Sequence, residues 1–228
     1  MNLETLRKNY ELKKPRIKSR LRDFDKFYNE PYSWFYNNGK LELNKVNTND
    51  NYRIFEELCF CILTANTSAV IGAKSIDVIR NILITGNLDE IQNKLKQVGY
   101  RFPNKRAEYI IEARNFLSSL DFKLKEKLNS LSQEERRDFV VNNFKGISYK
   151  EAGHFLRNIG FKDYCILDKH ILNSLYEFNI IKENKRPVNK KQYLEIENKM
   201  RDFAKNINID IDELDLLLWS IKSGDILK

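Results

Sequence analysis

The sequence predicts an all-α protein. Its 228 residues include only 8 glycines and 4 prolines, so helix-breaking signals are few. Several long segments place apolar residues three and four positions apart, which is the period of a helix with one buried face, and alternating apolar and polar runs are few. With 42% hydrophobic residues, the chain is long enough to form one domain or two joined lobes around a substantial core.

The first third of the chain is predicted to form two helices separated by a loop. A helix is expected at about 17–28, and the segment 30–51, which contains Pro31, Gly39 and several asparagines, is expected to be loop. The helix that follows, at about 53–65, is apolar almost throughout after its first turn. We therefore expect it at the centre of the core, with other helices around it.

The rest of the chain is predicted to be mainly helical. Ser132 and Glu135 form a capping box, in which the hydroxyl and the carboxylate satisfy unpaired amides, and this predicts a helix to about Asn143. The other predicted helices lie at about 69–84, 88–97, 105–117, 169–178, 190–207 and 212–223.

The surface is predicted to favour polyanions. The chain carries 40 Lys and Arg against 32 Asp and Glu, a formal net charge of +8, which suits nucleic acid or an anionic membrane. No segment approaches the run of about 18 apolar residues that a membrane span requires, and the first residues lack the apolar core of a secretory signal. We therefore expect a cytoplasmic protein without a transmembrane segment.

The cysteines are predicted to be core residues. Cys59 and Cys61 stand in an apolar run, and Cys165 is far from both in sequence. A free cysteine behaves as a small hydrophobic residue. The spacing does not fit an iron–sulfur cluster or a zinc site, which needs about four converging ligands. Since the chain has only 2 histidines, a metal hydrolase is disfavoured.

The stretch from Phe144 to Leu156 carries the features that point to a function. Gly146 stands where the backbone between two helices must turn tightly, and Ile147 is expected to pack back between them. The second helix then begins near Ser148, and the free amides of a helix N-terminus form an anion site that suits a DNA phosphate. Taken alone, Lys150 is an ordinary surface lysine and Asp168, 18 residues later, an ordinary N-cap.

This stretch resembles the helix-hairpin-helix element of a large DNA glycosylase superfamily. The resemblance implies two helical lobes with the active-site cleft between them, and a hairpin at about 134–159 that holds the DNA backbone through Gly146 and Ser148. In bifunctional members, a lysine at the position of Lys150 and an aspartate at the position of Asp168 form the catalytic pair. Lys150 would attack C1′ and form a Schiff base that permits β-elimination, while the carboxylate stabilises positive charge on the sugar.

Within the superfamily, the chain resembles the archaeal-type 8-oxoguanine DNA glycosylase/AP lyases. The resemblance runs from about Glu56 to the C-terminus, and the segments around 59–66, 106–110, 146–158 and 193–198 are the most similar. The tail is also similar, and it implies that Trp219 and Lys228, with its free carboxylate, help to form the base pocket. The substrate implied is double-stranded DNA that contains an oxidised purine, and the enzyme is expected to act as a monomer.

Three further features rest on the same resemblance. Asn66, after the central helix, is expected to fill the space left by the flipped base. The backbone carbonyls of Asn142, Phe144 and Ile147 match positions that hold a monovalent cation in relatives, and no other cofactor, in particular no iron–sulfur cluster, is expected.

The lobes are expected to be discontinuous, one mainly from about 69–160 and the other from the N-terminal part and about 165–228. Two alternatives stay open: a glycosylase for a different damaged base, and a non-catalytic helix-hairpin-helix module that binds DNA.

Overall fold

The computed structural model describes residues 2–224 and 226. Over these residues the fold is mainly helical, with one two-stranded antiparallel sheet and a short 3-10 turn at Arg80–Ile82. The elements are α1 (Leu3–Asn29), β1 (Tyr32–Asn37), β2 (Lys40–Lys45), α2 (Asp50–Thr64), α3 (Ala69–Ile79), α4 (Leu88–Gln97), α5 (Pro103–Ser118), α6 (Leu124–Asn129), α7 (Gln133–Asn143), α8 (Tyr149–Asn158), α9 (Lys169–Glu177), α10 (Lys190–Ile207) and α11 (Ile211–Ser223).

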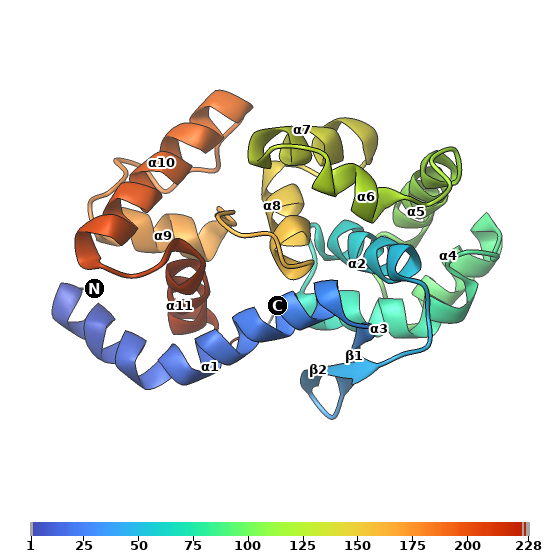
Figure 1. Ribbon diagram of the computed structural model, residues 1–228, viewed down its shortest axis with the longest axis horizontal. Helices are drawn as coiled ribbons and strands as arrows, with labels where there is room; N and C mark the ends of the chain where they lie inside the picture. Colours follow the sequence, from blue (N-terminus) through green and yellow to red (C-terminus); the bar gives the residue numbers. More distant parts are fainter. Residues whose placement is uncertain (1, 225, 227–228) are drawn as a thin grey trace.

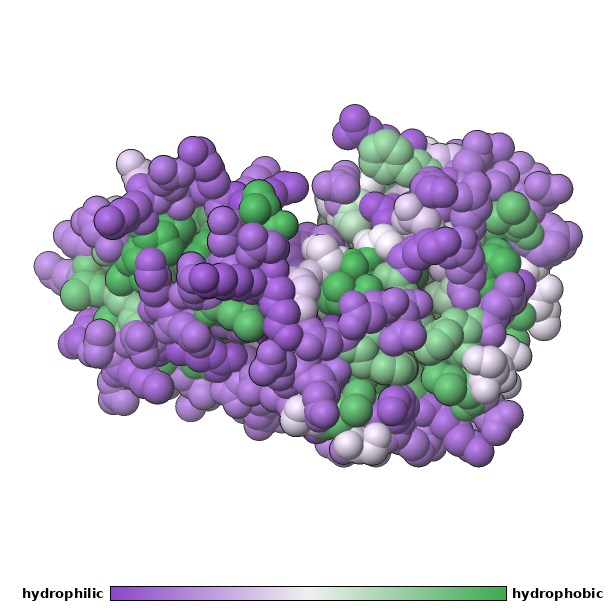
Figure 2. Space-filling model, turned by 90° about the horizontal axis from the view of Figure 1, so that it is seen from above, coloured by the Kyte–Doolittle hydropathy of each residue, from purple (hydrophilic) through white to green (hydrophobic). Residues whose placement is uncertain are grey.

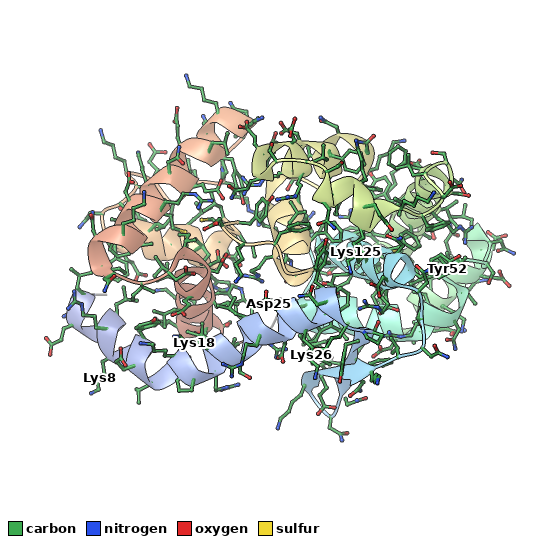
Figure 3. All side chains as sticks on the ribbon, in the orientation of Figure 1. Lys8, Lys18, Asp25, Lys26, Tyr52 and Lys125 are labelled. Carbon is green, nitrogen blue, oxygen red and sulfur yellow. The ribbon has the colours of Figure 1, made fainter. Side chains whose placement is uncertain are left out.

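The helices form two lobes that α1 joins along one side (Figure 1). Helices α9, α10 and α11 make one lobe, and α2 to α8 with the hairpin make the other. The first half of α1 binds α11, where Tyr10 donates to the Glu213 carboxylate. The second half meets the other lobe, where Arg53 donates to the Phe27 carbonyl over 2.7 Å. Lys8 extends from α1 away from the body of the molecule (Figure 3).

Helix α2 is the centre of the larger lobe, as its apolar sequence predicts. Residues on every side of α2 are buried, and the helix contacts α3, α5, α6 and α8. The expected division into lobes began this lobe mainly at about 69 and assigned the N-terminal part to the C-terminal helices; in the structure α2, which precedes residue 69, belongs to the lobe of the helices that follow it. A helix that is apolar all round needs neighbours on all sides, and in this chain the helices that follow it supply them.

The prediction of a loop over 30–51 was wrong, because residues 32–45 form a β-hairpin. Its strands pair Asn37 with Lys40, so the connection is the two-residue turn Asn38–Gly39, in which both residues have positive φ, 46° and 84°. Asn-Gly is the sequence that such a turn favours. Trp34 and Leu41 are buried on one face of the hairpin. The strands are too short for their alternation to stand out among the surrounding polar residues.

Other predicted boundaries agree closely or differ for simple reasons. The helices at 88–97 and 190–207 and the capping box of Ser132 with Glu135 are confirmed. Helix α1 begins at Leu3, well before the predicted residue 17, and continues through Pro15, which is exposed. The six-residue α6 was not predicted, because so short a segment carries little periodic signal.

The three cysteines are buried in the core, as predicted, and none of them forms a disulfide. Burial raises the pKa of Cys59 and of Cys165 well above the usual value of a thiol, so both remain protonated. Over the described residues, no helix is long and apolar enough to cross a membrane.

Candidate functional site

The hairpin between α7 and α8 is built around Gly146. Its φ is +81°, and a Cβ at this position would collide with the Arg106 guanidinium and lie 2.6 Å from Cδ2 of Tyr109. A side chain is therefore excluded both by conformation and by space. Ile147 is 7% exposed and packs into the core, as predicted. Ser148 is exposed and caps α8, and Glu151 completes a capping box.

Arg106 ties the hairpin to the turn that carries Asn66. Its Nη1 donates to the Gly146 carbonyl over 3.5 Å and its Nη2 to the Ala65 carbonyl over 3.0 Å. Tyr100 holds the same turn by donating to the Leu63 carbonyl over 2.7 Å. Asn66 itself is exposed, with a φ of +64°, which asparagine tolerates. The structure thus places the predicted wedge on a braced turn beside the predicted phosphate-binding hairpin.

Lys150 lies in the first turn of α8 and is partly buried. Its side chain is 30% exposed, and Nζ lies 2.8 Å from Oε1 of Glu151. Burial raises the pKa of Glu151, but the Lys150 ammonium and the Ser148 hydroxyl outweigh this effect, so its pKa lies below the usual value. Glu151 is therefore ionised at neutral pH and forms an ion pair with Lys150.

Asp168 lies at the N-terminus of α9, at the junction of the two lobes. Its Oδ1 accepts the backbone amides of His170 and Ile171 over 2.8 and 2.9 Å, so it is the N-cap that the sequence predicts. The side chain is partly exposed. The side-chain hydrogen bonds described for Asp168 are both accepted by Oδ1.

The extended segment 163–167, which leads to Asp168, is fixed by polar side chains from α10 and α11. Glu197 accepts the Cys165 amide over 3.0 Å, and Asp215 accepts the Ile166 amide over 2.8 Å. The Tyr193 hydroxyl donates to the Cys165 carbonyl over 2.7 Å and accepts the Leu167 amide over 3.3 Å. The amides of Cys165, Ile166 and Leu167 are thus satisfied although these residues are buried.

Buried arginines balance these carboxylates. Arg137 donates twice to Glu197, with both distances 2.7 Å, and Arg157 donates to Asp215 over 2.8 Å. Burial raises the pKa of Asp215 to about 7, although Arg157 and the Ile166 amide lower it. Arg157 itself belongs to α8, so this pair attaches the hairpin's second helix to the segment before Asp168.

Lys150 lies on the face of α8 that packs against the segment before Asp168. Lys150, Gly153 and Arg157 are spaced three and four residues apart, so they lie along one side of the helix. A Cβ on Gly153 would lie 3.2 Å from the Cys165 carbonyl, so the backbones approach closely there. Gly153 thus lies against this segment, Arg157 is linked to it through Asp215, and Lys150 lies one turn earlier on the same side of the helix.

The aromatic side chain predicted for base recognition lies beside the same helix terminus. Trp219 of α11 is partly exposed, and its ring meets that of His170 edge-on, with centroids 6.4 Å apart. His170 follows Asp168 by two residues, so the indole is close to the candidate catalytic carboxylate. Lys228, the other residue predicted for the pocket, lies outside the described residues.

The two lobes meet across a hollow. Seen from above, the surface has a notch between them (Figure 2). Lys190, at the start of α10, bridges the lobes by pairing with Asp138 over 2.7 Å and Glu134 over 2.8 Å, both on α7. Asp138 also accepts the Tyr149 hydroxyl of α8.

Several residues that build the site had no assigned role in the sequence. Tyr193 and Glu197 fall in a stretch, and Asp215 in a tail, where the resemblance is marked, and that was the one available signal. Their partners lie 26 to 49 residues away, so spacing alone could not reveal them. Glu151 lies within the hairpin stretch, but the sequence did not identify it as the partner of Lys150.

Comparison with known proteins gives consistent matches over most of the chain. Residues 38–209 match the sequence profile of the 8-oxoguanine DNA glycosylase family (Ogg-HhH). The 8-oxoguanine DNA glycosylase/AP lyase of Methanocaldococcus jannaschii is 44% identical over 188 residues, which are 82% of this chain and 88% of that protein. The protein of the same name from Fusobacterium nucleatum is 37% identical over 211 residues, 90% of this chain and 96% of that protein.

The structural comparison extends over nearly the whole chain. The M. jannaschii 8-oxoguanine glycosylase/lyase, crystallised in complex with a 15mer DNA containing 8-oxoguanine, superposes with a TM-score of 0.82 at 38% identity. The superposition covers 99% of this chain and 100% of that one.

Proposed function

This chain belongs to the 8-oxoguanine DNA glycosylase family, and from that premise we propose that it excises 8-oxoguanine from duplex DNA and then cleaves the strand as an AP lyase. We propose Lys150 as the nucleophile and Asp168 as the carboxylate that stabilises the reacting sugar. The observation that supports this pair most strongly is the face of α8 that also carries Lys150: Gly153 lies against the Cys165 carbonyl, and Arg157 binds Asp215, which accepts the Ile166 amide before Asp168.

The two side chains suit the two halves of the reaction. When the C1′–N9 bond breaks, positive charge develops on the sugar, and the Asp168 carboxylate stabilises it electrostatically. The base leaves with the bonding pair and is protonated. The uncharged Lys150 amine forms a bond to C1′, and ring opening gives a Schiff base. Loss of a C2′ proton then breaks the C3′–O bond and releases the 3′ phosphate, while the imine accepts the electron pair.

The remaining contacts position the nucleotide. The free amides at the start of α8, with Gly146 and Ser148, bind backbone phosphate without reading sequence. Asn66 enters the space of the flipped base from its braced turn. Trp219 offers a flat surface for stacking on an oxidised purine, and Lys228 is proposed as a second pocket residue.

A monovalent cation at the hairpin is a proposal of the same kind. Ile147 donates its amide to the Phe144 carbonyl over 3.4 Å, a long bond that leaves most of the acceptor capacity of this oxygen. The backbone carbonyls of Asn142, Phe144 and Ile147, at and after the C-terminal end of α7, fit a cation that needs only oxygen ligands. It would neutralise the negative end of the α7 dipole beside DNA phosphate. We propose no other cofactor, and a monomer as the active form.

Borohydride trapping on duplexes that contain 8-oxoguanine tests the proposal. We expect a covalent protein–DNA adduct, and we expect Lys150→Gln to abolish it while duplex binding stays largely intact. Lys145→Gln is the matched control, because Lys145 is an exposed lysine of the same hairpin and should not affect trapping. No adduct with any lesion, together with intact binding, would favour a non-catalytic DNA-binding module. An adduct only with another damaged base would assign a different substrate.

A further inference from the structure

The structure assigns to Glu151 a role in positioning the nucleophile: its carboxylate holds the protonated amine of Lys150 at the start of α8 before the amine reacts. This inference rests on the proposed function, since it presumes that Lys150 is the nucleophile. It concerns a residue that contacts the amine of the nucleophile and forms no bond to the substrate.

The geometry places one carboxylate between two functional groups. Oε1 of Glu151 lies 2.8 Å from Nζ of Lys150. Oε2 accepts the Ser148 amide over 3.2 Å and also accepts the Ser148 hydroxyl. The Glu151 side chain is only 10% exposed, whereas that of Lys150 is 30% exposed. The carboxylate is therefore fixed by the helix cap, and the more mobile lysine is attached to it.

The pairing has a chemical consequence. An amine adds to C1′ only after it has lost its proton, and an adjacent carboxylate stabilises the protonated form. The Glu151 carboxylate, with Oε1 2.8 Å from Nζ, is therefore placed to oppose the loss of that proton.

A glutamate that caps a helix does not have to pair with a lysine. In the second capping box of the same hairpin, Glu135 accepts the Ser132 amide over 2.8 Å, and no lysine pairing is described for it. The two boxes have the same local chemistry and differ in the presence of Lys150. They form a natural comparison between a cap alone and a cap that also holds a nucleophile.

The surroundings of the pair define what else could titrate. On α8, His154 lies one turn beyond Lys150 and packs edge-on against Phe60. The charged groups on the neighbouring elements are Asp138 of α7, Lys190 of α10, Asp168 before α9, Asp215 of α11, and Arg157 further along α8. Asp138 pairs with Lys190 and Asp215 pairs with Arg157, whereas the ion pair described for Lys150 is with Glu151. The other groups are the same in every variant below.

The test is the pH profile of borohydride trapping on a duplex with a preformed abasic site. On this substrate the amine adds to the aldehyde carbon, water leaves, and borohydride reduces the imine, so base release does not contribute. We expect Glu151→Gln to move the midpoint of the trapping rate to lower pH than in wild type, because the carboxylate that stabilises the ammonium form is removed. Glutamine keeps the capping acceptor. Glu135→Gln should leave the profile at the wild-type position, and Glu151→Asp should return it most of the way.

The possible results distinguish a failure of the role assigned to Glu151 from a failure of the proposed function. A profile for Glu151→Gln that matches wild type, or that moves to higher pH, overturns the inference even if wild type traps well. A shift shared by Glu135→Gln also overturns it, because the cap alone would then be responsible. If wild type forms no adduct at any pH, the proposed function fails and the inference falls with it. Equal melting temperatures for the two glutamine variants will show that folding does not cause the difference.

Discussion

Replacement of Gly146 by alanine tests how tightly the hairpin is fitted to its support. An L-residue at φ +81° costs about 1–2 kcal/mol in backbone energy. The new methyl group also displaces Arg106, which loses buried bonds to the Gly146 and Ala65 carbonyls, at about 1–3 kcal/mol. We therefore expect Gly146→Ala to lower the free energy of unfolding by roughly 2–5 kcal/mol.

Gly99→Ala is the matched control for this prediction. Gly99 has a φ of +69°, but nothing lies within 4 Å of a Cβ built there, so the substitution costs the backbone term alone, about 1–2 kcal/mol. Urea unfolding of the two variants measures both losses, and duplex affinity should fall only for Gly146→Ala, because Arg106 also supports the turn of Asn66. Equal destabilisation by the two substitutions would refute the close fit of Arg106 and Tyr109 around the turn.

Three further predictions address the catalytic carboxylate, the stability and the wedge. Asp168→Asn should keep the N-cap of α9 and the stability of the protein but reduce base excision by orders of magnitude. Asp168→Ala should in addition lower the free energy of unfolding by about 1 kcal/mol. Equal activity of Asp168→Asn and wild type would contradict the electrostatic role. Burial raises the pKa of Asp212 to about 6, so its contribution to stability is full below the unfolded pKa near 3.8 and is lost as the pH rises through 6. The free energy of unfolding in urea should therefore differ less between pH 4 and pH 8 for Asp212→Asn than for wild type. Asn66→Ala should slow excision from duplex DNA more than from single strands, where no vacated stack needs filling, and an equal loss on both substrates would remove it as the wedge.

The sequence predicted those parts of the fold whose signals are local. The capping box of Ser132, the helix at 190–207 and the tight turn at Gly146 depend on residues within a few positions of one another. The β-hairpin was missed although Asn38–Gly39 is a strong turn signal, because the strands beside it are short and Trp34 and Leu41 are their only deeply buried apolar residues.

The support of the candidate site could not be predicted, because it depends on partners that are distant in sequence. A carboxylate such as Asp215 is in sequence an ordinary helical acid. Only the fold shows that it is buried, bound to Arg157 and bonded to the Ile166 amide before Asp168. The segment before Asp168 contains no proline, so its amides are available as donors to Glu197, Asp215 and Tyr193.

The central claim is that one amine, that of Lys150, becomes covalently attached to the sugar of the damaged nucleotide. The most direct measurement is mass spectrometry of the peptide that carries the sugar after borohydride reduction and proteolysis of the trapped complex. The account predicts that the modified peptide contains Lys150 and that fragmentation places the added mass on its side chain. Modification of any other amine in the wild-type protein, with Lys150 recovered unmodified, would contradict it.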